Sequence, residues 1–293
     1  MPNTQHSMSV AFQGMPGAYS HIACSDVFPD LDVLPCISFE DALAAVRNEQ
    51  ARYAMIPIEN SLAGRVADIH HLLPDSGLHI IGEYYLPVHH HLLGVPGSRL
   101  EDIRTVYSHV HAIGQCRTLI RDLGLNAVIA ADTAGSARDI ASLGDPQVAA
   151  IASALAGEIH GLVSLKANVE DATHNTTRFV VMARTPLVPA VESGPVVTGL
   201  IFQVRNVPSS LYKALGGFAT NNVNMSRLES YQINGQFIST RFFAEIEGHP
   251  ASPSMIRAME ELEFFSTEVR ILGVWPAHPY RFRARNRDMV PEQ

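Results

Sequence analysis

The chain has 293 residues, of which 46% are hydrophobic and 17% are charged, and its formal net charge at pH 7 is −8. A single domain usually takes about 100–200 residues, so this length leaves room for two domains. The hydrophobic content excludes an intrinsically disordered chain, and the negative charge without a run of Lys or Arg argues against nucleic-acid binding.

The cysteines and the N-terminus indicate a cellular compartment. Cys24, Cys36 and Cys116 are odd in number and widely spaced, which predicts free thiols in a reducing environment. Residues 1–7 are polar and lack the basic-then-apolar pattern of a signal peptide. No apolar run is long enough to span a bilayer. We therefore expect a cytoplasmic protein that has no membrane partner.

The first part of the chain alternates strand and helix patterns. Strands are predicted at 10–12, 31–36 and 53–58, and helices at 18–27, 38–48 and 64–73, with Ser38 as the N-cap of the second helix. A β-rich region at 78–95, broken at Pro87, separates this group from a second one. The second group has predicted strands at 105–107, 127–130 and 148–151 and predicted helices at 111–123 and 134–143.

This alternation predicts parallel βαβ units and an α/β fold with two lobes. Two segments cross between the lobes, so a ligand-binding cleft is expected between them. Small and polar residues lie at the junctions between predicted strands and the helices that follow them. In a parallel sheet such junctions direct the helix N-termini towards one crevice at the carboxyl edge of the strands. Together with Arg178 they favour a site for a small dicarboxylic anion, although for any single junction an ordinary N-cap is the more common explanation. These residues are Gly17, Ser20, Glu59, Asn60, Ser61, Ser108 and Thr133.

The stretch 173–179 places hydroxyl, amide, imidazole and guanidinium groups next to one another. An Arg beside a Thr can hold a carboxylate while the hydroxyl acts on a neighbouring oxygen. The alternative is an ordinary turn that enters a strand. Among the histidines, His89 and His91 share one face of a strand without a further ligand, so no metal site is expected, whereas His111 near Gln115 is a site candidate.

The sequence from 185 onwards predicts a linker and a second domain. Residues 185–195 contain three prolines. Strands at 196–204, 224–233, 236–246 and 267–274 and helices at 209–219 and 254–264 then follow in the order βαββαβ, which is the ferredoxin-like arrangement, with a hairpin at Asn234-Gly235. So small an open sheet favours dimerisation. The Arg-rich end of the chain is expected to be flexible.

Several of these residues resemble the motifs of one family. They are the segment from Gly14 to Ser20, the segment Pro57-Ile-Glu-Asn-Ser61 with Gly64, Ser108-His109 with Gln115-Cys116, Thr133-Ala134 and, most specifically, Thr177-Arg178-Phe179. The segments from Pro208 to Leu215 and from Asn224 to Ser230 resemble the signatures of an ACT regulatory domain. The chain is thus similar to prephenate dehydratases with a C-terminal ACT domain, of the type without a fused chorismate mutase domain.

The resemblance implies a two-lobed, periplasmic-binding-protein-like catalytic domain at 8–185, a linker at 186–195, an ACT domain at 196–280 and a flexible tail at 281–293. It implies conversion of prephenate to phenylpyruvate, carbon dioxide and water in phenylalanine biosynthesis, without a cofactor or metal. Thr177 would be the catalytic hydroxyl, Arg178 would anchor a carboxylate, and Phe179 would pack on the substrate ring or fix the strand. The implied substrate-binding residues are Gly17, Tyr19, Ser20, Ser38, Glu59, Asn60, Ser61, Gly64, Ser108, His111, Gln115 and Thr133.

The resemblance also implies feedback inhibition by L-phenylalanine and assembly into a homodimer or homotetramer. The implied effector-binding residues are Ser209, Ser210, Leu211, Asn224, Leu228, Glu229 and Ser230. Ser209-Ser210 stands where Gly-Ala is common, and the Arg-Pro pair common after Ser230 is absent. Two alternatives stay open: an arogenate or cyclohexadienyl dehydratase, and, from another class, a non-catalytic amino-acid-binding sensor.

Overall fold

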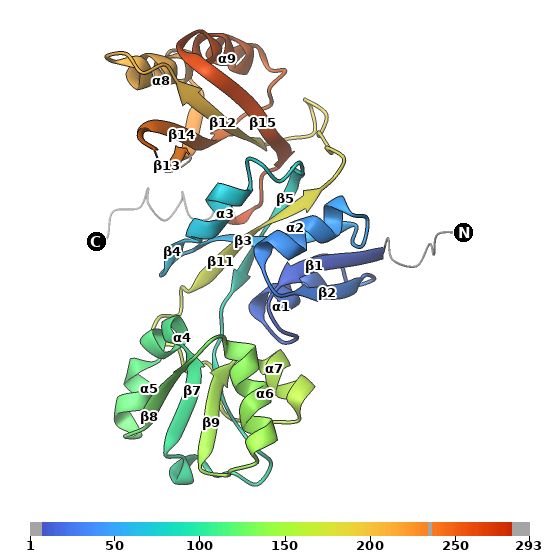
Figure 1. Cartoon of the computed structure of the whole chain (residues 1–293), viewed down its shortest axis with the longest axis vertical. Helices are drawn as coiled ribbons and strands as arrows, with labels where there is room; N and C mark the ends of the chain where they lie inside the picture. Colours follow the sequence, from blue (N-terminus) through green and yellow to red (C-terminus); the bar gives the residue numbers. More distant parts are fainter. Residues whose placement is uncertain (1–7, 234–235, 283–293) are drawn as a thin grey trace. The chain divides into compact units, whose positions relative to one another are not determined.

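The structure is a computed structural model that describes residues 8–233 and 236–282 (Figure 1). The chain forms two compact units, the first from residues 1–66 and 85–179 and the second from residues 67–84 and 180–293. Strands β5 (His79–Pro87) and β11 (Thr176–Ala183) each continue from one unit into the other. The predicted division into domains at 185 and 196 stays a prediction.

The first unit begins with the predicted βαβαβ series. It contains β1 (Ser9–Gln13), α1 (Tyr19–Val27), β2 (Asp32–Cys36), α2 (Phe39–Arg47) and β3 (Tyr53–Asn60), and β1 pairs in parallel with both β2 and β3. Ser38 caps α2 through a capping box with Asp41, as its position before the helix predicts. The parallel α/β architecture of this region is therefore confirmed.

The region after the third strand differs from the prediction. β3 extends through Glu59 and Asn60, which the sequence analysis assigned to the following loop. Gly64, whose φ is 80°, and Arg65 then form β4 (Gly64–Arg65), which pairs antiparallel with the end of β3. A helix starting at 64 is therefore wrong, because Gly64 and Arg65 pair with β3 and the positive φ of Gly64 lies outside the range of a right-handed helix. α3 (Ala67–Leu72) starts only after it, in the second unit.

A second sheet completes the first unit. Its strands lie in the order β10-β6-β9-β7-β8: β6 is His91–Gly94, β7 Thr105–His109, β8 Asn126–Ala130, β9 Val148–Ala152 and β10 Val163–Lys166. The helix predicted at 111–123 is instead two helices, α4 (Val110–Gln115) and α5 (Arg117–Asp122), which are separated at Cys116, where φ is −125°. α6 (Thr133–Leu143) is near its predicted place, whereas α7 (Ala154–His160) and β10 were not predicted.

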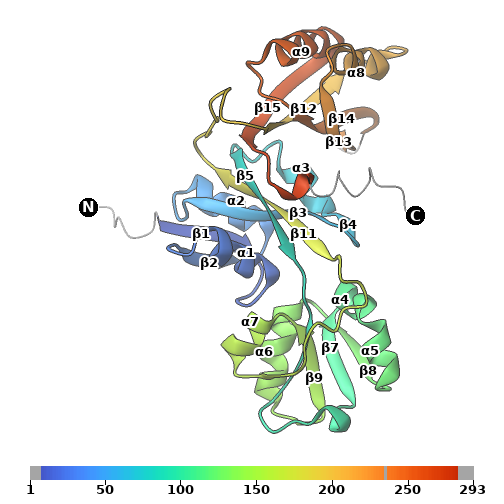
Figure 2. The same cartoon turned by 180° about the vertical axis from the view of Figure 1, so that it is seen from behind.

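Alternate residues of this sheet form two separate cores. Leu92 and Ile151 pack with α4 and α5, whereas their chain neighbours Leu93 and Ala150 pack with α6 and α7. Because successive strand residues point to opposite faces, both faces of the sheet are covered. Figures 1 and 2 show β7 and β9 with α4 and α5 on one side and α6 and α7 on the other.

The second unit contains the predicted βαββαβ series. It consists of β12 (Val196–Val204), α8 (Ser210–Thr220), β13 (Asn224–Ile233), β14 (Gln236–Glu247), α9 (Pro253–Phe265) and β15 (Ser266–Pro276), with the sheet order β13-β14-β12-β15. Ala214 and Phe218 of α8 and Ala258 and Leu262 of α9 pack on one face of this sheet. The ferredoxin-like topology is confirmed, while the predicted turn at Asn234-Gly235 lies outside the described residues.

The second unit also holds α3 and most of β5 against the βαββαβ sheet. A Cβ atom on Gly273 would lie 2.0 Å from the carbonyl oxygen of Ile80, so β15 can approach β5 this closely only with glycine there. Arg281 donates to both Oε atoms of Glu83 at 2.6 and 2.7 Å and to Oε2 of Glu245 at 2.6 Å. A flexible tail starting at 281 is therefore wrong for Arg281, which two buried carboxylates hold in place.

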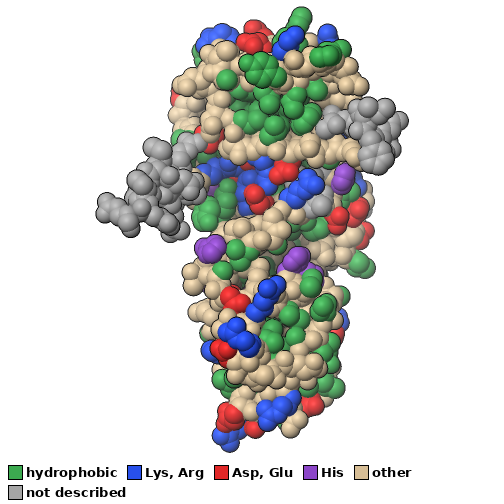
Figure 3. Space-filling view, turned by 90° about the vertical axis from the view of Figure 1, so that its left-hand side faces the viewer, with side chains coloured by type: hydrophobic (Ala, Val, Ile, Leu, Met, Phe, Trp, Pro, Cys, Tyr) green, Lys and Arg blue, Asp and Glu red, His purple; other side chains and the backbone are tan. Residues whose placement is uncertain are grey.

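The described ranges contain all three cysteines of the chain. Cys24, Cys36 and Cys116 are free thiols, and burial raises the pKa of Cys24 and of Cys116 to about 12. Every helix within these ranges is too short or too polar to cross a lipid bilayer. On the face drawn in Figure 3, Lys and Arg side chains are interspersed with Asp and Glu rather than gathered in one basic field.

Candidate functional site

Thr177 lies on β11 beside the end of β3. Asn60 Nδ2 donates to Thr177 Oγ1 at 3.0 Å and also to Asn175 Oδ1 at 2.8 Å. The Asn60 amide has a fixed orientation, because its Oδ1 accepts from the backbone N–H groups of Leu62 and Ala63 at 3.0 and 2.8 Å. Thr177 Oγ1 therefore accepts from Asn60, and its own hydroxyl proton is directed to another acceptor.

The hydrogen bonds continue from Asn175 into a chain of side chains. Asn175 Nδ2 donates to Gln115 Oε1 at 2.9 Å, and His90 Nε2 lies 3.0 Å from the same oxygen. At the other side of the ring, His90 Nδ1 is 2.6 Å from the Tyr19 hydroxyl, which is also 2.8 Å from the carbonyl oxygen of His89. This hydrogen-bond network thus runs from Thr177 to Tyr19 without a gap.

These side chains come from elements far apart in the sequence. Tyr19 starts α1, Asn60 ends β3, Gln115 ends α4, and His90 and Asn175 lie just before β6 and β11. The network therefore joins elements of both sheets within the first unit. Because all these groups are amides, hydroxyls or imidazole, the network can orient hydrogen-bond donors without adding a net charge.

Burial controls the ionisation of the network. Desolvation, with smaller contributions from Cys116 and Glu170, raises the pKa of Tyr19 well above its usual value, so its hydroxyl stays protonated. Burial also lowers the pKa of His90, although the hydrogen bond to Gln115 and the charge of Glu170 act in the opposite direction. Glu170 accepts from the backbone N–H of His90 at 2.8 Å and lies 2.8 Å from His89 Nδ1. Burial, the largest of these effects, therefore favours the neutral form of the His90 ring.

Arg178 and Thr177 lie on opposite faces of β11, because successive strand residues alternate. The Arg178 side chain is buried, its guanidinium carbon lies 5.7 Å from the centre of the Tyr85 ring, and its Nη1 lies 4.0 Å from Glu59 Oε2. The expectation that the two neighbours act side by side on one substrate does not fit this geometry. Phe179 is 1% exposed, which favours fixing the strand over packing on a substrate.

Gly17 and Ser20 lie near the start of α1 and are buried. Gly17 has a φ of 90°, and a Cβ atom there would lie 2.6 Å from Ala156 Cα. Its carbonyl oxygen accepts from Ser153 Oγ at 2.5 Å, and Ser153 Oγ accepts from the N–H of Ala156 at 3.0 Å. Gly17 therefore allows the α1 turn to pack tightly against the N-terminus of α7.

Other predicted residues make local contacts instead of joining the network. Ser108 is inside β7 rather than after it, and its hydroxyl donates to the carbonyl oxygen of Ile151 at 2.6 Å. Ser38 belongs to the capping box of α2, and Thr133 follows the actual N-cap of α6, Asp132. The ring of His111 is exposed and 5.1 Å from that of His109. Ser61 accepts from the N–H of Thr176 at 3.0 Å and so links the end of β3 to β11.

Sequence reasoning missed two members of the network. His90 is not among the predicted site residues, although period-two alternation already separates it from His89 and His91. Its exposed fraction is 2%. Asn175 stands two residues before Thr177, a spacing that places both on one face of an extended chain. Across residues 8–233 and 236–282, no group of three or more His, Cys, Asp or Glu side chains could hold a metal ion.

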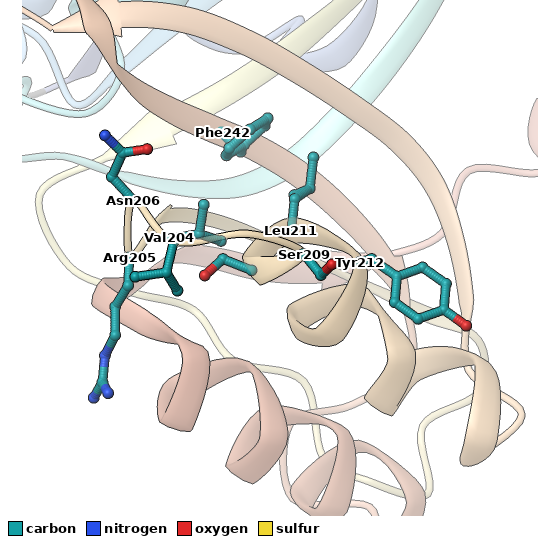
Figure 4. A pocket seen from close by; sticks show the side chains of 9 residues that line it. Val204, Arg205, Asn206, Ser209, Leu211, Tyr212 and Phe242 are labelled. Carbon is teal, nitrogen blue, oxygen red and sulfur yellow. The ribbon is translucent and has the colours of Figure 1, made fainter.

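A second candidate site lies in the second unit (Figure 4). A cavity of about 280 Å³ is lined by the segment from the end of β12 to the first turn of α8 and by Phe242 of β14: Val204, Arg205, Asn206, Val207, Ser209, Ser210, Leu211, Tyr212 and Phe242. Ser209 precedes α8 with a φ of 64° and does not cap the helix with its side chain. The Ser210 hydroxyl is buried without a hydrogen-bond partner in the described part of the chain. Three predicted effector residues thus line this cavity.

The other predicted effector residues lie on β13. Ser230 stands directly opposite Phe242 and Leu228 opposite Ala244, so both side chains share the sheet face of Phe242. Glu229 is opposite Phe243 and faces the other side, where its Oε1 is 3.5 Å from Arg227 Nε. Asn224 lies before the register shift at 225–227.

Comparison with known proteins matches the family described as prephenate dehydratase to residues 10–187. A bifunctional N-acyl-homoserine lactone acylase/prephenate dehydratase of Komagataeibacter europaeus is 51% identical over 93% of this chain and 97% of its own. The chloroplastic arogenate dehydratase/prephenate dehydratase 1 of Arabidopsis thaliana is 38% identical over 91% of this chain and 71% of its own.

Among solved structures, the prephenate dehydratase of Arthrobacter aurescens in complex with L-Phe superposes with a TM-score of 0.83. It is 28% identical, and the match covers 95% of this chain and 97% of that one. The chain therefore belongs to the prephenate dehydratase family, a family of dehydratase lyases.

Proposed function

We propose that this protein converts prephenate to phenylpyruvate, with loss of water and carbon dioxide. Catalysis would take place in the two-lobed part of the chain, 8–185, in a cleft where the network meets the substrate. No cofactor or metal is required, because aromatisation of the ring drives the departure of both groups.

The single observation that carries this proposal is the direction of the hydrogen bond at Thr177. Because Asn60 Nδ2 donates to Thr177 Oγ1, the Thr177 hydroxyl is left to donate to an oxygen of a bound ligand. In prephenate this oxygen would be the ring hydroxyl that departs as water. A Thr hydroxyl is a weak acid, so it would stabilise or relay the proton rather than be its ultimate source.

The carboxylates of the substrate need further donors. Gln115 Oε1 already faces two donors, Asn175 and His90, so the Gln115 NH₂ group is the part of this amide that can bind a ligand oxygen. The N–H groups at the start of α1, beside Tyr19 and Ser20, would supply another anion-binding surface. Arg178 would support the site by holding Glu59 and Tyr85 rather than by touching the substrate.

Purified protein incubated with prephenate tests the activity, with phenylpyruvate as the measured product. Steady-state rates with L-arogenate in the same assay test the nearest alternative, since arogenate differs only by an amino group in place of the side-chain keto group. We expect a higher kcat/KM with prephenate. Phenylalanine formation from arogenate at a higher kcat/KM would instead identify an arogenate dehydratase, and binding without turnover of either compound would identify a sensor.

We further propose that the βαββαβ series is an ACT domain at which L-phenylalanine inhibits the enzyme. The cavity beside Ser209, Ser210 and Leu211 combines an apolar lining from Leu211 and Phe242 with the unpartnered hydroxyl of Ser210. Such a lining suits an aromatic side chain next to a charged amino-acid backbone. The A. aurescens relative, which was solved with L-Phe, supports this choice of effector.

Titration with L-phenylalanine, followed by activity and by light scattering, tests this regulation. We expect inhibition with a coupling on the order of 1–3 kcal/mol, together with tighter assembly into a homodimer or homotetramer. An unchanged activity and an unchanged oligomeric state at saturating phenylalanine would show that the domain has another role.

A second candidate function comes from the K. europaeus relative, whose description combines the dehydratase with an N-acyl-homoserine lactone acylase and which is 51% identical. In that reaction water adds to the amide carbonyl, the C–N bond breaks, and a fatty acid and homoserine lactone are released. Incubation with N-acyl-homoserine lactones of different chain lengths, with detection of free homoserine lactone, tests this activity. Absence of the product in preparations that dehydrate prephenate would remove the candidate.

A further inference from the structure

His90 is buried at the centre of the network, and the surrounding acceptors determine where its protons lie. The polarity of the network is fixed at one end, because the backbone N–H groups of Leu62 and Ala63 both donate to Asn60 Oδ1. Asn60 Nδ2 must then face the oxygen of Asn175, which leaves Asn175 Nδ2 to face the oxygen of Gln115. Each of the three side-chain amides in this network thus has one allowed orientation.

The next contact concerns the histidine ring. Gln115 Oε1 lies 3.0 Å from His90 Nε2, and an amide oxygen can only accept a hydrogen bond. Nε2 must therefore carry a hydrogen. In the neutral ring Nδ1 then has none, so the single proton of the Tyr19 hydroxyl has two acceptors within reach, His90 Nδ1 at 2.6 Å and the carbonyl oxygen of His89 at 2.8 Å. The backbone N–H groups of Leu62 and Ala63 thus impose this tautomer through three amides.

We propose that His90, backed by Tyr19, is a positioning residue: it donates from Nε2–H to Gln115 Oε1 and so stabilises the Gln115 amide in the orientation that the backbone imposes through Asn60 and Asn175, the same orientation that leaves the Thr177 hydroxyl as a donor. His90 does not touch the reacting atoms. Without its N–H, Gln115 Oε1 keeps a single donor, Asn175, and a rotation of the Gln115 amide by 180° would set two NH₂ groups against each other. The expected effect of His90 on turnover rests on the proposed dehydration at Thr177, whereas the tautomer of His90 does not depend on that proposal.

The tautomer is tested directly by NMR spectroscopy on the full chain with ¹⁵N-labelled histidine. The two-bond ¹H–¹⁵N spectrum distinguishes a protonated ring nitrogen from an unprotonated one, and the signals of His90 are assigned by their loss in His90→Gln. We expect Nε2 of His90 to carry the proton. An unprotonated Nε2 would overturn the inference even if the enzyme converts prephenate normally, which separates this failure from a failure of the proposed function.

The positioning role is tested with two variants. His90→Gln keeps an N–H donor close to the place of Nε2, whereas His90→Leu removes both ring nitrogens at similar volume. One oriented hydrogen bond corresponds to a loss in kcat of about tenfold. We therefore expect His90→Leu to lower kcat by about 10-fold or more with a smaller change in KM, and His90→Gln to recover most of that loss.

His249→Gln is a matched control for the loss of a buried histidine. His249 is 9% exposed, and its Nε2 is 3.1 Å from the carbonyl oxygen of Pro189, in the second unit. This variant is expected to lower the melting temperature while kcat stays unchanged. Equal losses of kcat in His90→Leu and His90→Gln, or a wild-type kcat in His90→Leu, would contradict the positioning role.

Discussion

Removal of the Thr177 hydroxyl separates catalysis from stability. In Thr177→Val the side chain keeps its shape, and Asn60 Nδ2 loses one acceptor but keeps Asn175 Oδ1 at 2.8 Å. The free energy of unfolding should fall by about 1 kcal/mol, the net value of one hydrogen bond. The loss of proton-transfer help should lower kcat on the order of 10²–10⁴-fold, which corresponds to about 2.7–5.5 kcal/mol of activation free energy.

These two magnitudes make the assay decisive. Steady-state conversion of prephenate gives kcat and KM, and thermal unfolding followed by circular dichroism gives the change in stability. We expect a large loss of kcat with little change in KM and a fall of a few degrees in Tm. Thr177→Ser, which keeps the hydroxyl, should retain kcat within about tenfold. A kcat near the wild-type value in Thr177→Val would refute the assignment of Thr177 as the donor to the departing oxygen.

Four further changes test other parts of the structure. Asn60→Asp replaces the donor to Thr177 with an acceptor, so the Thr177 hydroxyl should donate to the new carboxylate and kcat should fall by about 10²-fold or more. A kcat near the wild-type value would show that the direction of the hydrogen bond between residues 60 and 177 does not matter for turnover. Arg178→Lys loses the stacking on Tyr85, so Tm should fall while KM changes little, with the exposed Arg121→Lys as the control. A large rise in KM at an unchanged Tm would instead indicate that Arg178 binds the substrate. Burial lowers the pKa of His90 in the folded state, so the contribution of the neutral ring to the free energy of unfolding is complete above the unfolded pKa of about 6.5 and decreases as the pH falls from there towards the folded pKa. Urea unfolding of His90→Gln from pH 8 to 5 should therefore show a smaller loss of stability than urea unfolding of the wild type. Parallel plots of stability against pH for the two proteins would contradict this. Ser209→Gly should raise the unfolding free energy by roughly 0.5–1 kcal/mol relative to Ser209→Ala, because Ser209 has a left-handed φ of 64°, and an equal stability of the two variants would argue against strain at this position.

The sequence by itself determined most of the elements and their order, but not α7 and β10. The β1 to β3 series, the capping box at Ser38 and the βαββαβ series are local consequences of hydrophobic period, N-cap chemistry and turn residues, and they lie within a few residues of the predicted places. Predictions were wrong where a contact from another element overrides local preference. The pairing of β4 with the end of β3 keeps Gly64 and Arg65 out of the following helix, and the helix predicted at 111–123 is interrupted at Cys116.

The composition of the candidate site was decided only by tertiary structure. The motif at 177–179 pointed to Thr177 from sequence alone, but adjacency in sequence placed Arg178 with it, whereas strand alternation sends the two side chains to opposite faces. Conversely, His90 and Asn175 carry no sequence signal strong enough to select them, because their importance lies in hydrogen bonds to Tyr19 and Gln115, from elements remote in the chain. Local pattern specifies which groups are available, and only the packing of distant elements decides which of them meet and in which direction each hydrogen bond points.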